Sequence, residues 1–191
     1  PGRDVKLSED RVKGYRNFLN KIWNANNFLI QNDCKFENIE TPNDLKLNIN
    51  KWIFVEFTNT NEKIKKSIDS YRFDEAARIA YQFVWHSFCD WYLELSKTVF
   101  YSENNENIEE TRNVASFIFT QILVILHPFI PFLTEEIWLK NKLDKDGKDS
   151  LMLKNWSEAI SNKDKDSDEV NEKIEFVSSI SSFKNEIEIS T

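Results

Sequence analysis

Residues 74–97 restrict the fold of this chain more than any other stretch, because they are apolar around almost the whole circumference of a helix. The stretch reads DEAARIAYQFVWHSFCDWYLELSK and contains neither glycine nor proline. A helix at a protein surface shows one apolar stripe, whereas a helix that is apolar on most sides packs against several neighbours. The sequence therefore predicts that these residues form the central helix of an α-helical bundle.

One edge of this helix stays polar. At 100° per residue, His86, Asp90, Glu94 and Lys97 fall within roughly 80° of arc, with Leu93 beside them. Charged side chains on so apolar a helix must reach solvent or a partner, since an unpaired buried charge is costly. The edge is therefore either a solvated seam or a contact surface, and the pattern leaves both open.

The first helix is expected to begin after Ser8, which precedes two acidic residues, and to run to about Gln31. Its apolar stripe follows a 3-4 spacing and predicts the side that faces the core: Val12, Tyr15, Leu19, Ile22, Asn26 and Leu29. Almost diametrically opposite lies a second row, within about 60° of arc: Asn17, Lys21, Asn24 and Phe28.

This second row is unusual for a solvated face, because it combines hydrogen-bonding side chains with an aromatic ring. Amides and a lysine can read the edges of nucleic-acid bases, and an exposed ring can stack on a base. The alternative is a plain surface whose Phe28 is covered by a neighbouring loop. The row by itself does not decide between them.

The remaining chain predicts more helices and one candidate strand. Residues 32–44 read as a loop, in which Thr41 and Pro42 resemble a helix cap and a first helical position. Apolar periodicity, loop composition and proline positions give these further elements: helices over about 49–71, 108–126, 131–143 and 170–191, a loop over 102–107, and a short strand within 151–156.

The expected fold class is thus all-α, a helical bundle with at most one short strand. We expect a bundle over residues 1–143, a loop, short strand and linker over 144–169, and the start of a C-terminal region over 170–191. The chain begins with Pro-Gly rather than Met, and we expect it to be a fragment of a longer protein.

Composition excludes several classes of function. The net charge of −7 argues against a non-specific nucleic-acid binder, although residues 1–30 carry six Lys and Arg against three Asp and Glu. Two cysteines are too few for a disulfide framework or a zinc site and are typical of a reducing cytoplasm. No run of 18 apolar residues predicts a membrane span.

Catalytic chemistry is also not expected in this chain. The two histidines, His86 and His127, have no carboxylate at metal-ligand spacing on a shared face. Only three glycines are present, and none of them are clustered into a phosphate-binding loop. We therefore expect no catalytic residue, no metal site and no cofactor within these residues.

Three motifs resemble the anticodon-binding domain of the valyl-tRNA synthetases. They are RNFLNKIWNANNF at 16–28, SYRFDEAARIAYQFVWHSFCDWYLELSK at 70–97 and HPFIPFLTEEIW at 127–138. The third is shared by the class I synthetases for Val, Ile, Leu and Met, whereas the first two resemble the valine enzyme in particular. Their order and approximate spacing match the family to about residue 187.

The resemblance implies a helical bundle that grips the anticodon loop of tRNA(Val), together with the rest of a synthetase chain. The complete enzymes of this family attach valine to tRNA(Val) with ATP and Mg²⁺, and their catalytic and editing domains would lie outside these residues. No membrane partner is implied, and we expect a cytoplasmic monomer.

By motif position, the resemblance assigns anticodon contacts to Lys21, Phe28, Leu93 and Glu94. Asn17 and Asn24 join them only because they share the face of Lys21 and Phe28. Two alternatives remain open: the same module from an isoleucine-type class I synthetase, and a helical scaffold that binds another protein through the 17/21/24/28 row.

Overall fold

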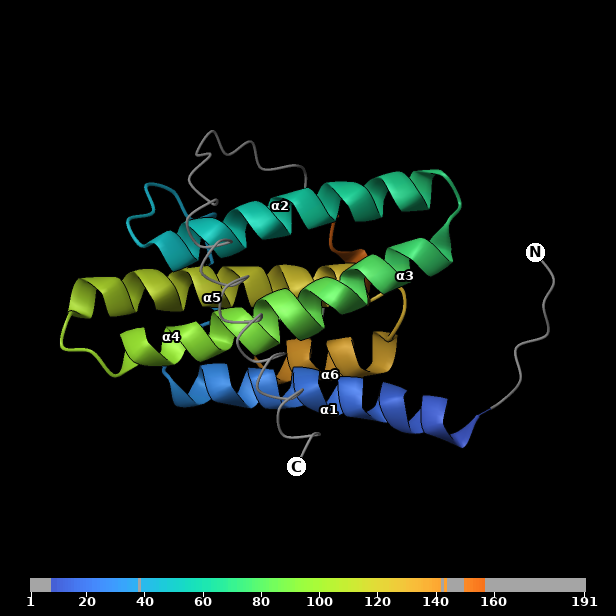
Figure 1. Ribbon diagram of the computed structural model, residues 1–191, viewed down its shortest axis with the longest axis horizontal. Coiled ribbons are helices and arrows are strands. Elements are labelled where there is room, and N and C mark those ends of the chain that lie inside the picture. The colour runs from blue at the N-terminus through green and yellow to red at the C-terminus, as the bar shows by residue number, and fades with distance from the viewer. Residues whose placement is uncertain (1–7, 38, 142, 144–149, 157–191) are drawn as a thin grey trace, which may run out of the picture.

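A single rod runs from residue 73 to residue 100, where the sequence predicts the helix of residues 74–97. The computed structural model describes residues 8–37, 39–141, 143 and 150–156, and Figure 1 shows that the rod lies between α1 and α2. The elements are α1 (Glu9–Gln31), α2 (Asn48–Asp69), α3 (Phe73–Gln82), η1 (Phe83–Tyr92), α4 (Leu93–Phe100), α5 (Asn105–Leu126), α6 (Pro131–Lys140) and η2 (Leu151–Leu153).

The middle of the rod is a π-helix, η1, which joins α3 to α4 without a break. A π-helix closes i→i+5 hydrogen bonds, and it mostly occurs as a single turn, frequently at functional sites. Here it extends over ten residues. Because each of its turns holds more residues than an α-helical turn, side chains beyond it are rotated relative to a 100° wheel. The α-helical register drawn from the sequence is therefore only approximate across η1.

The most enclosed helix among the described residues is α5 rather than the rod. Residues 114–120 of α5 are all buried, and α5 packs against α1, α2, α3, α4 and α6. The rod buries Phe83, Phe88 and Tyr92 completely or nearly so, but leaves Trp85 and Trp91 half-exposed. The prediction of a helical bundle is confirmed, whereas the most central position belongs to α5.

Aromatic rings fill the space between α2, the rod and α5. Phe88 stacks on Phe119 with ring centroids 6.1 Å apart, and Phe54 stacks on Phe117 at 5.8 Å. Buried aromatic pairs of this kind contribute about 0.5–1.5 kcal/mol beyond the burial of their area. Tyr92 is fully buried, and its hydroxyl donates to Asn50 Oδ1 at 2.9 Å.

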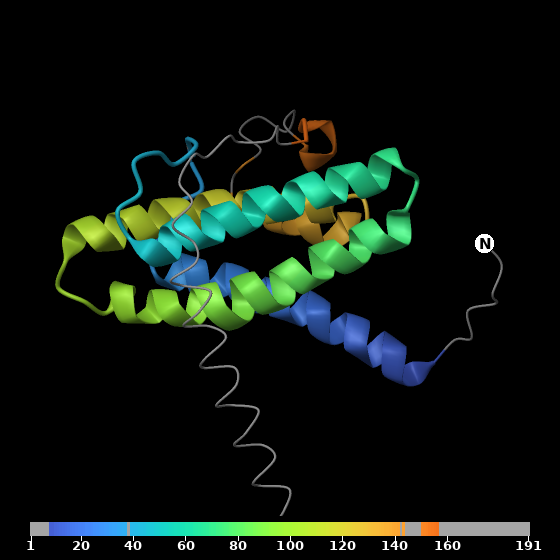
Figure 2. The same cartoon turned by 45° about the horizontal axis from the view of Figure 1, so that its top comes forward.

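The N-terminal half of α1 extends beyond the bundle (Figures 1 and 2). Val12 and Tyr15, predicted to face the core, are 52% and 65% exposed because this half has no neighbouring helix to pack against. Ile22, Asn26 and Leu29 are buried as predicted, and Leu19 is half-buried. The stripe is therefore correct only where neighbouring helices exist.

The start of α2 differs from the sequence expectation. Thr41 and Pro42 lie in the loop, and the helix begins at Asn48 with Leu47 as its N-cap. Leucine offers no capping oxygen, but the carboxylate of Glu110 on α5 accepts hydrogen bonds from the backbone N–H of Leu47 and from Asn50 Nδ2, at 3.0 and 2.8 Å. A side chain distant in sequence thus does what a local cap would do.

The predicted strand within 151–156 is wrong. Residues 151–153 form the 3-10 turn η2, in which the Ser150 side chain accepts from the backbone N–H of Met152 and the backbone N–H of Leu151 donates to Glu135 on α6. A strand needs a partner strand, and the described residues contain none.

The predicted helix over 170–191 lies outside the described residues. No helix in the described part of the chain has the length and apolarity that a membrane span requires.

Candidate nucleic-acid interface

A groove of about 430 Å³ lies between α1 and the η1–α4 part of the rod. It is lined by Lys21, Asn24, Ala25 and Phe28 from α1, and by Cys89, Asp90, Leu93, Glu94 and Lys97 from the rod. Five of the six residues chosen from the sequence therefore meet in one groove. Asn17 is the exception, since it is exposed on α1 but does not line the groove.

Lys21 is held in place by two partners. Its ammonium group forms an ion pair with Asp90, and it lies 4.6 Å from the centroid of the Trp85 ring. Asp90 also approaches His86, whose Nδ1 is 3.2 Å from Asp90 Oδ2. The sequence placed Lys21 on a surface away from the core; the structure adds that the lysine is already paired with a carboxylate.

Phe28 is half-buried, so the free ring expected from the sequence is only partly free. One side of the ring packs on Phe100, with centroids 6.1 Å apart, and Lys97 Nζ lies 5.8 Å from the Phe28 centroid. These neighbours fix the orientation of the ring while it still lines the groove. A ring held in one orientation loses little conformational entropy when it stacks on a base.

Glu94 is an exposed carboxylate whose two oxygens both accept from Lys97 Nζ at 2.7 Å. Lys97 therefore connects the carboxylate to the Phe28 ring. Lys97 and Asp90 were part of the polar edge seen in the sequence but were not chosen as site residues. Because they lie on the same helical edge as Glu94, the sequence could have indicated that they belong to the site.

The floor of the groove is apolar and chemically inert. Leu93 and Cys89 are 5% and 7% exposed, and Ala25 lies beside them. Burial raises the pKa of the Cys89 thiol to about 12, so it stays protonated at neutral pH and is neither a nucleophile nor a metal ligand. Within the described ranges, no group of three or more His, Cys, Asp or Glu side chains could hold a metal ion.

Two cations and two carboxylates line the groove, so that its charges balance: Lys21, Lys97, Asp90 and Glu94. A neutral groove does not attract a polyanion from a distance. It does present an aromatic ring, a carboxylate acceptor and ammonium donors above an apolar floor, which is the combination that binds an unstacked base. The arrangement is therefore suited to recognising bases rather than phosphates.

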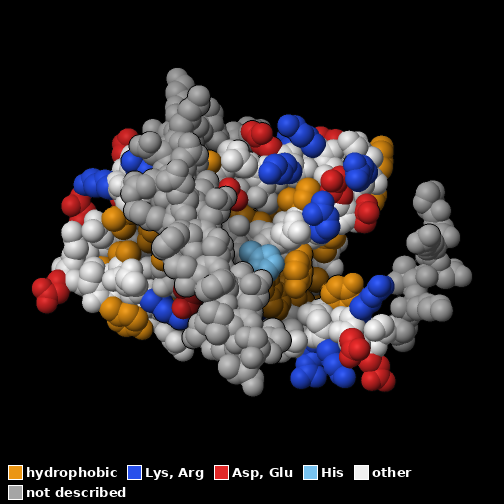
Figure 3. Space-filling view, viewed as in Figure 1, with side chains coloured by type: hydrophobic (Ala, Val, Ile, Leu, Met, Phe, Trp, Pro, Cys, Tyr) orange, Lys and Arg blue, Asp and Glu red, His pale blue; other side chains and the backbone are white. Residues whose placement is uncertain are grey.

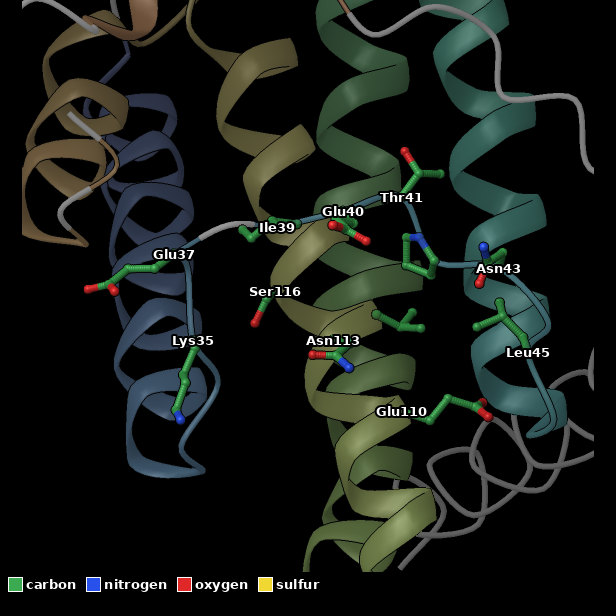
Figure 4. Close-up of a pocket in the computed structure, with 12 residues that line it drawn as sticks. Lys35, Glu37, Ile39, Glu40, Thr41, Asn43, Leu45, Glu110, Asn113 and Ser116 are labelled. Carbon is green, nitrogen blue, oxygen red and sulfur yellow. The ribbon is translucent and has the colours of Figure 1, made fainter. Parts of the chain in front are cut away.

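A second hollow, of about 390 Å³, lies between the loop before α2 and the side of α5 (Figure 4). Its charged lining consists of Lys35 against Glu37, Glu40 and Glu110. The excess of carboxylates disfavours a nucleic acid, and Glu110 already caps α2. This hollow is a poorer candidate than the groove beside α1.

Comparison with known proteins also indicates a nucleic-acid interface. Residues 50–191 match the family model described as the anticodon-binding domain of tRNA ligase. The chain is 59% identical over 190 residues to a valine–tRNA ligase of Pelagibacter ubique (strain HTCC1062), covering 100% of this chain and 22% of that protein. It is 40% identical over 189 residues to that of Agrobacterium fabrum, covering 98% of this chain and 20% of that protein.

A valine–tRNA ligase of Buchnera aphidicola is 45% identical over 159 residues, which is 82% of this chain and 16% of that protein. The chain thus spans about a fifth of the length of these relatives. The all-helical fold and the match over residues 50–191 together show that this chain belongs to the family of anticodon-binding domains of tRNA ligases.

Proposed function

We propose that this chain recognises the anticodon loop of tRNA(Val) as one module of a valine–tRNA ligase. The observation that carries the proposal is the groove in which Lys21, Phe28, Leu93 and Glu94 meet. Similarity to valine–tRNA ligases over the whole chain supports the choice of valine over isoleucine. The complete ligase would attach valine to tRNA(Val) with ATP and Mg²⁺, through residues outside this chain.

Each groove residue has a specific role in this proposal. Phe28 stacks on an unstacked anticodon base, a contact worth about 1–3 kcal/mol. Glu94 accepts a hydrogen bond from the exocyclic amino group of C or A, which suits valine anticodons because they end in A-C. Leu93 forms the apolar floor beneath the bound base, since it is almost completely buried.

The remaining residues support these contacts. Lys21 donates to a base acceptor or a phosphate from the position that Asp90 and Trp85 give it. Asn24 lines the same groove and offers an amide to a base edge. Asn17 would meet the RNA only beyond the groove. The ligase would act in the cytoplasm as a monomer, with residues 1–143 as the recognition bundle and 144–191 as connection and the beginning of a C-terminal region.

Binding to matched RNA hairpins tests the proposal. We would measure the Kd of the 191-residue chain for an anticodon stem–loop of tRNA(Val) and for the same hairpin with an isoleucine anticodon. The valine hairpin should bind more tightly. Phe28→Ala should weaken its binding by about 1–3 kcal/mol, the value of one base–aromatic stack. Glu94→Ala should reduce the difference between the two hairpins.

Two exposed residues on other elements provide matched controls. Phe132 on α6 is 92% exposed, and Glu62 on α2 is exposed and does not line the groove beside α1. Phe132→Ala and Glu62→Ala should leave both Kd values unchanged. A helical scaffold for another protein would show equal binding to the two hairpins and no loss specific to the groove variants, and that result would exclude the proposed function.

A further inference from the structure

A second groove, of about 580 Å³, lies on the other side of the rod, between α2 and the α3–η1 segment. Its charged lining has three cations against two carboxylates: Lys63, Lys66 and Arg78, with Glu56 and Glu75. It is more positive than the neutral groove beside α1 and the acidic hollow beside α5. A local positive excess is notable in a chain whose net charge is −7.

The two lysines of this groove are available to an anion. Lys63 and Lys66 are exposed, three residues apart on α2, and neither is within ion-pair distance of a carboxylate among the described residues. Arg78 faces them from α3, where Glu75 Oε1 lies 3.7 Å from its guanidinium group. Both walls of the groove therefore carry positive charge. Figure 3 shows Lys and Arg side chains gathered over this end of α2 and α3.

The carboxylates of the groove oppose an anion less than their number suggests. Glu75 is engaged by Arg72 at 3.1 Å as well as by Arg78. Burial raises the pKa of Glu56, and the charge of nearby Lys63 acts in the opposite direction. Lys63 influences Glu56 through its charge without forming an ion pair with it, and Lys66 takes part in none of these interactions.

The rod connects this groove directly to the candidate anticodon site. His86 lines the α2 side, and its Nδ1 lies 3.2 Å from Asp90, which lines the α1 side. Figure 1 shows that α1 and α2 flank the same rod. The two grooves therefore adjoin at the contact between His86 and Asp90.

We propose that the basic groove between α2 and α3 binds the phosphate backbone of the tRNA strand adjoining the anticodon loop, through Lys63, Lys66 and Arg78. The inference rests on the proposed function and adds a second contact to it. Base contacts supply specificity, whereas phosphate contacts supply affinity and fix the register of the complex. The neutral anticodon groove offers the first kind of contact, and the basic groove offers the second.

The test compares two double variants of α2 that remove the same charge. Lys63→Ala/Lys66→Ala changes the groove, whereas Lys51→Ala/Lys65→Ala removes two lysines that do not line it. The Kd of each full chain for the valine and isoleucine hairpins is measured at several salt concentrations, and circular dichroism melting confirms equal folding.

Replacing the two groove lysines should weaken the binding of both hairpins by the same factor. It should also reduce the magnitude of the slope of log K against log salt by about two. When salt is raised from 50 to 200 mM, the variant should therefore lose about tenfold less affinity than the unchanged chain loses. The Lys51/Lys65 control should leave the slope unchanged.

Two results would overturn the inference in distinguishable ways. If the unchanged chain distinguishes the hairpins but the two double variants have the same salt slope, the basic groove is not a phosphate site and anticodon recognition stands. If the unchanged chain binds neither hairpin, both the inference and the proposed function are wrong.

Discussion

At the scale of single residues, the pairing of Lys21 with Asp90 bears on how much this lysine would contribute to the proposed RNA binding. The two side chains are 28% and 35% exposed, so their attraction is only partly screened by water. An ammonium group that is already neutralised attracts any phosphate less strongly. In the proposed function, Asp90 is therefore a positioning residue, which orients Lys21 and would suppress binding that is independent of RNA sequence.

Asp90→Asn should relax discrimination between anticodons. Without the carboxylate, Lys21 attracts phosphates of any RNA, so the isoleucine hairpin should gain affinity relative to the valine hairpin. The loss of a half-exposed ion pair should cost about 0.2–1 kcal/mol of folding stability. Asp74→Asn, at the exposed start of the same rod, removes the same charge and is the control. An equal effect of both variants on the two hairpins would show that net charge alone is responsible.

The two cysteines should be unreactive in the folded protein. Burial raises the pKa of both Cys34 and Cys89 to about 12, against an ordinary value of 9.0. Ellman's reagent at pH 8 should therefore modify neither thiol until denaturant is added, when both should react. Rapid modification of one thiol in native buffer would contradict the burial.

The same shift has a consequence for stability against pH. The folded protein retains protons that the unfolded chain releases above pH 9.0, so the contribution of the thiols is complete below pH 9.0 and is lost as the pH rises towards 12. Each thiol contributes a slope of about 1.4 kcal/mol per pH unit within this interval. Cys89→Ala should make the decrease of unfolding free energy above pH 9.0 less steep, as measured by urea titration.

Helical spacing could predict which side chains of each helix lie away from the core, and the family resemblance implied that the two sets face the same anticodon loop, but neither could predict the contacts that these side chains make. Lys21, Phe28 and Glu94 follow from helical spacing, because α1 and α4 are regular helices around these positions. Spacing within one helix contains no information on the facing helix. It could therefore not show that Phe100 covers part of Phe28 or that Asp90 neutralises Lys21.

At the scale of elements, a hydrogen-bonded cluster joins the rod to α2 and α5. The Tyr92 hydroxyl donates to Asn50 Oδ1 at 2.9 Å, and Asn50 Nδ2 lies 3.1 Å from Thr111 Oγ1 and 2.8 Å from Glu110 Oε1. Tyr92, Asn50 and Thr111 are completely buried. Leaving a buried polar group without its partner costs more folding free energy than the hydrogen bond itself contributes. The cluster therefore fixes the register of three helices at the end of η1, one residue before Leu93.

Tyr92→Phe should lower the free energy of unfolding by about 1–3 kcal/mol, because Asn50 Oδ1 is left buried without its donor. The measurement is equilibrium urea unfolding followed by circular dichroism. Tyr101→Phe is the matched control, since Tyr101 is 81% exposed and should change stability by less than about 0.5 kcal/mol. Equal stability of the two variants would contradict the structural role of the cluster.

The elements themselves were predicted well, and the errors have a common origin. The bounds of α1, α2 and α5 agree with their apolar periodicity. The helices α2 and α5 pack against neighbours along most of their length, and α1 does so from Phe18 onwards. Val12 and Tyr15 follow the same periodicity but extend beyond the bundle. The strand expected within 151–156 failed because a short apolar run does not reveal whether a partner strand exists. Apolar pattern predicts an element, whereas its neighbours determine what the element buries.

At the scale of the whole molecule, charge is distributed against general affinity for RNA. The chain has a net charge of −7, the groove beside α1 is neutral, and the groove between α2 and α3 is lined by three cations and two carboxylates. In the proposed complex, the net negative charge would weaken general attraction of a polyanion, while the two grooves would hold the bases and the backbone. Such a distribution favours discrimination between tRNAs over tight binding.

We accordingly expect the 191-residue chain to bind tRNA(Val) weakly, with a Kd in the micromolar range or above, about −8 kcal/mol or less favourable. In its relatives, the chain corresponds to about a fifth of the ligase. A complete ligase should bind more tightly because it would contact more of the tRNA. Affinity of the chain for intact tRNA(Val) should equal its affinity for the anticodon hairpin, since both proposed contacts are with the anticodon loop and the strand adjoining it. Nanomolar binding by the chain alone would mean that this surface also holds parts of the tRNA distant from the anticodon.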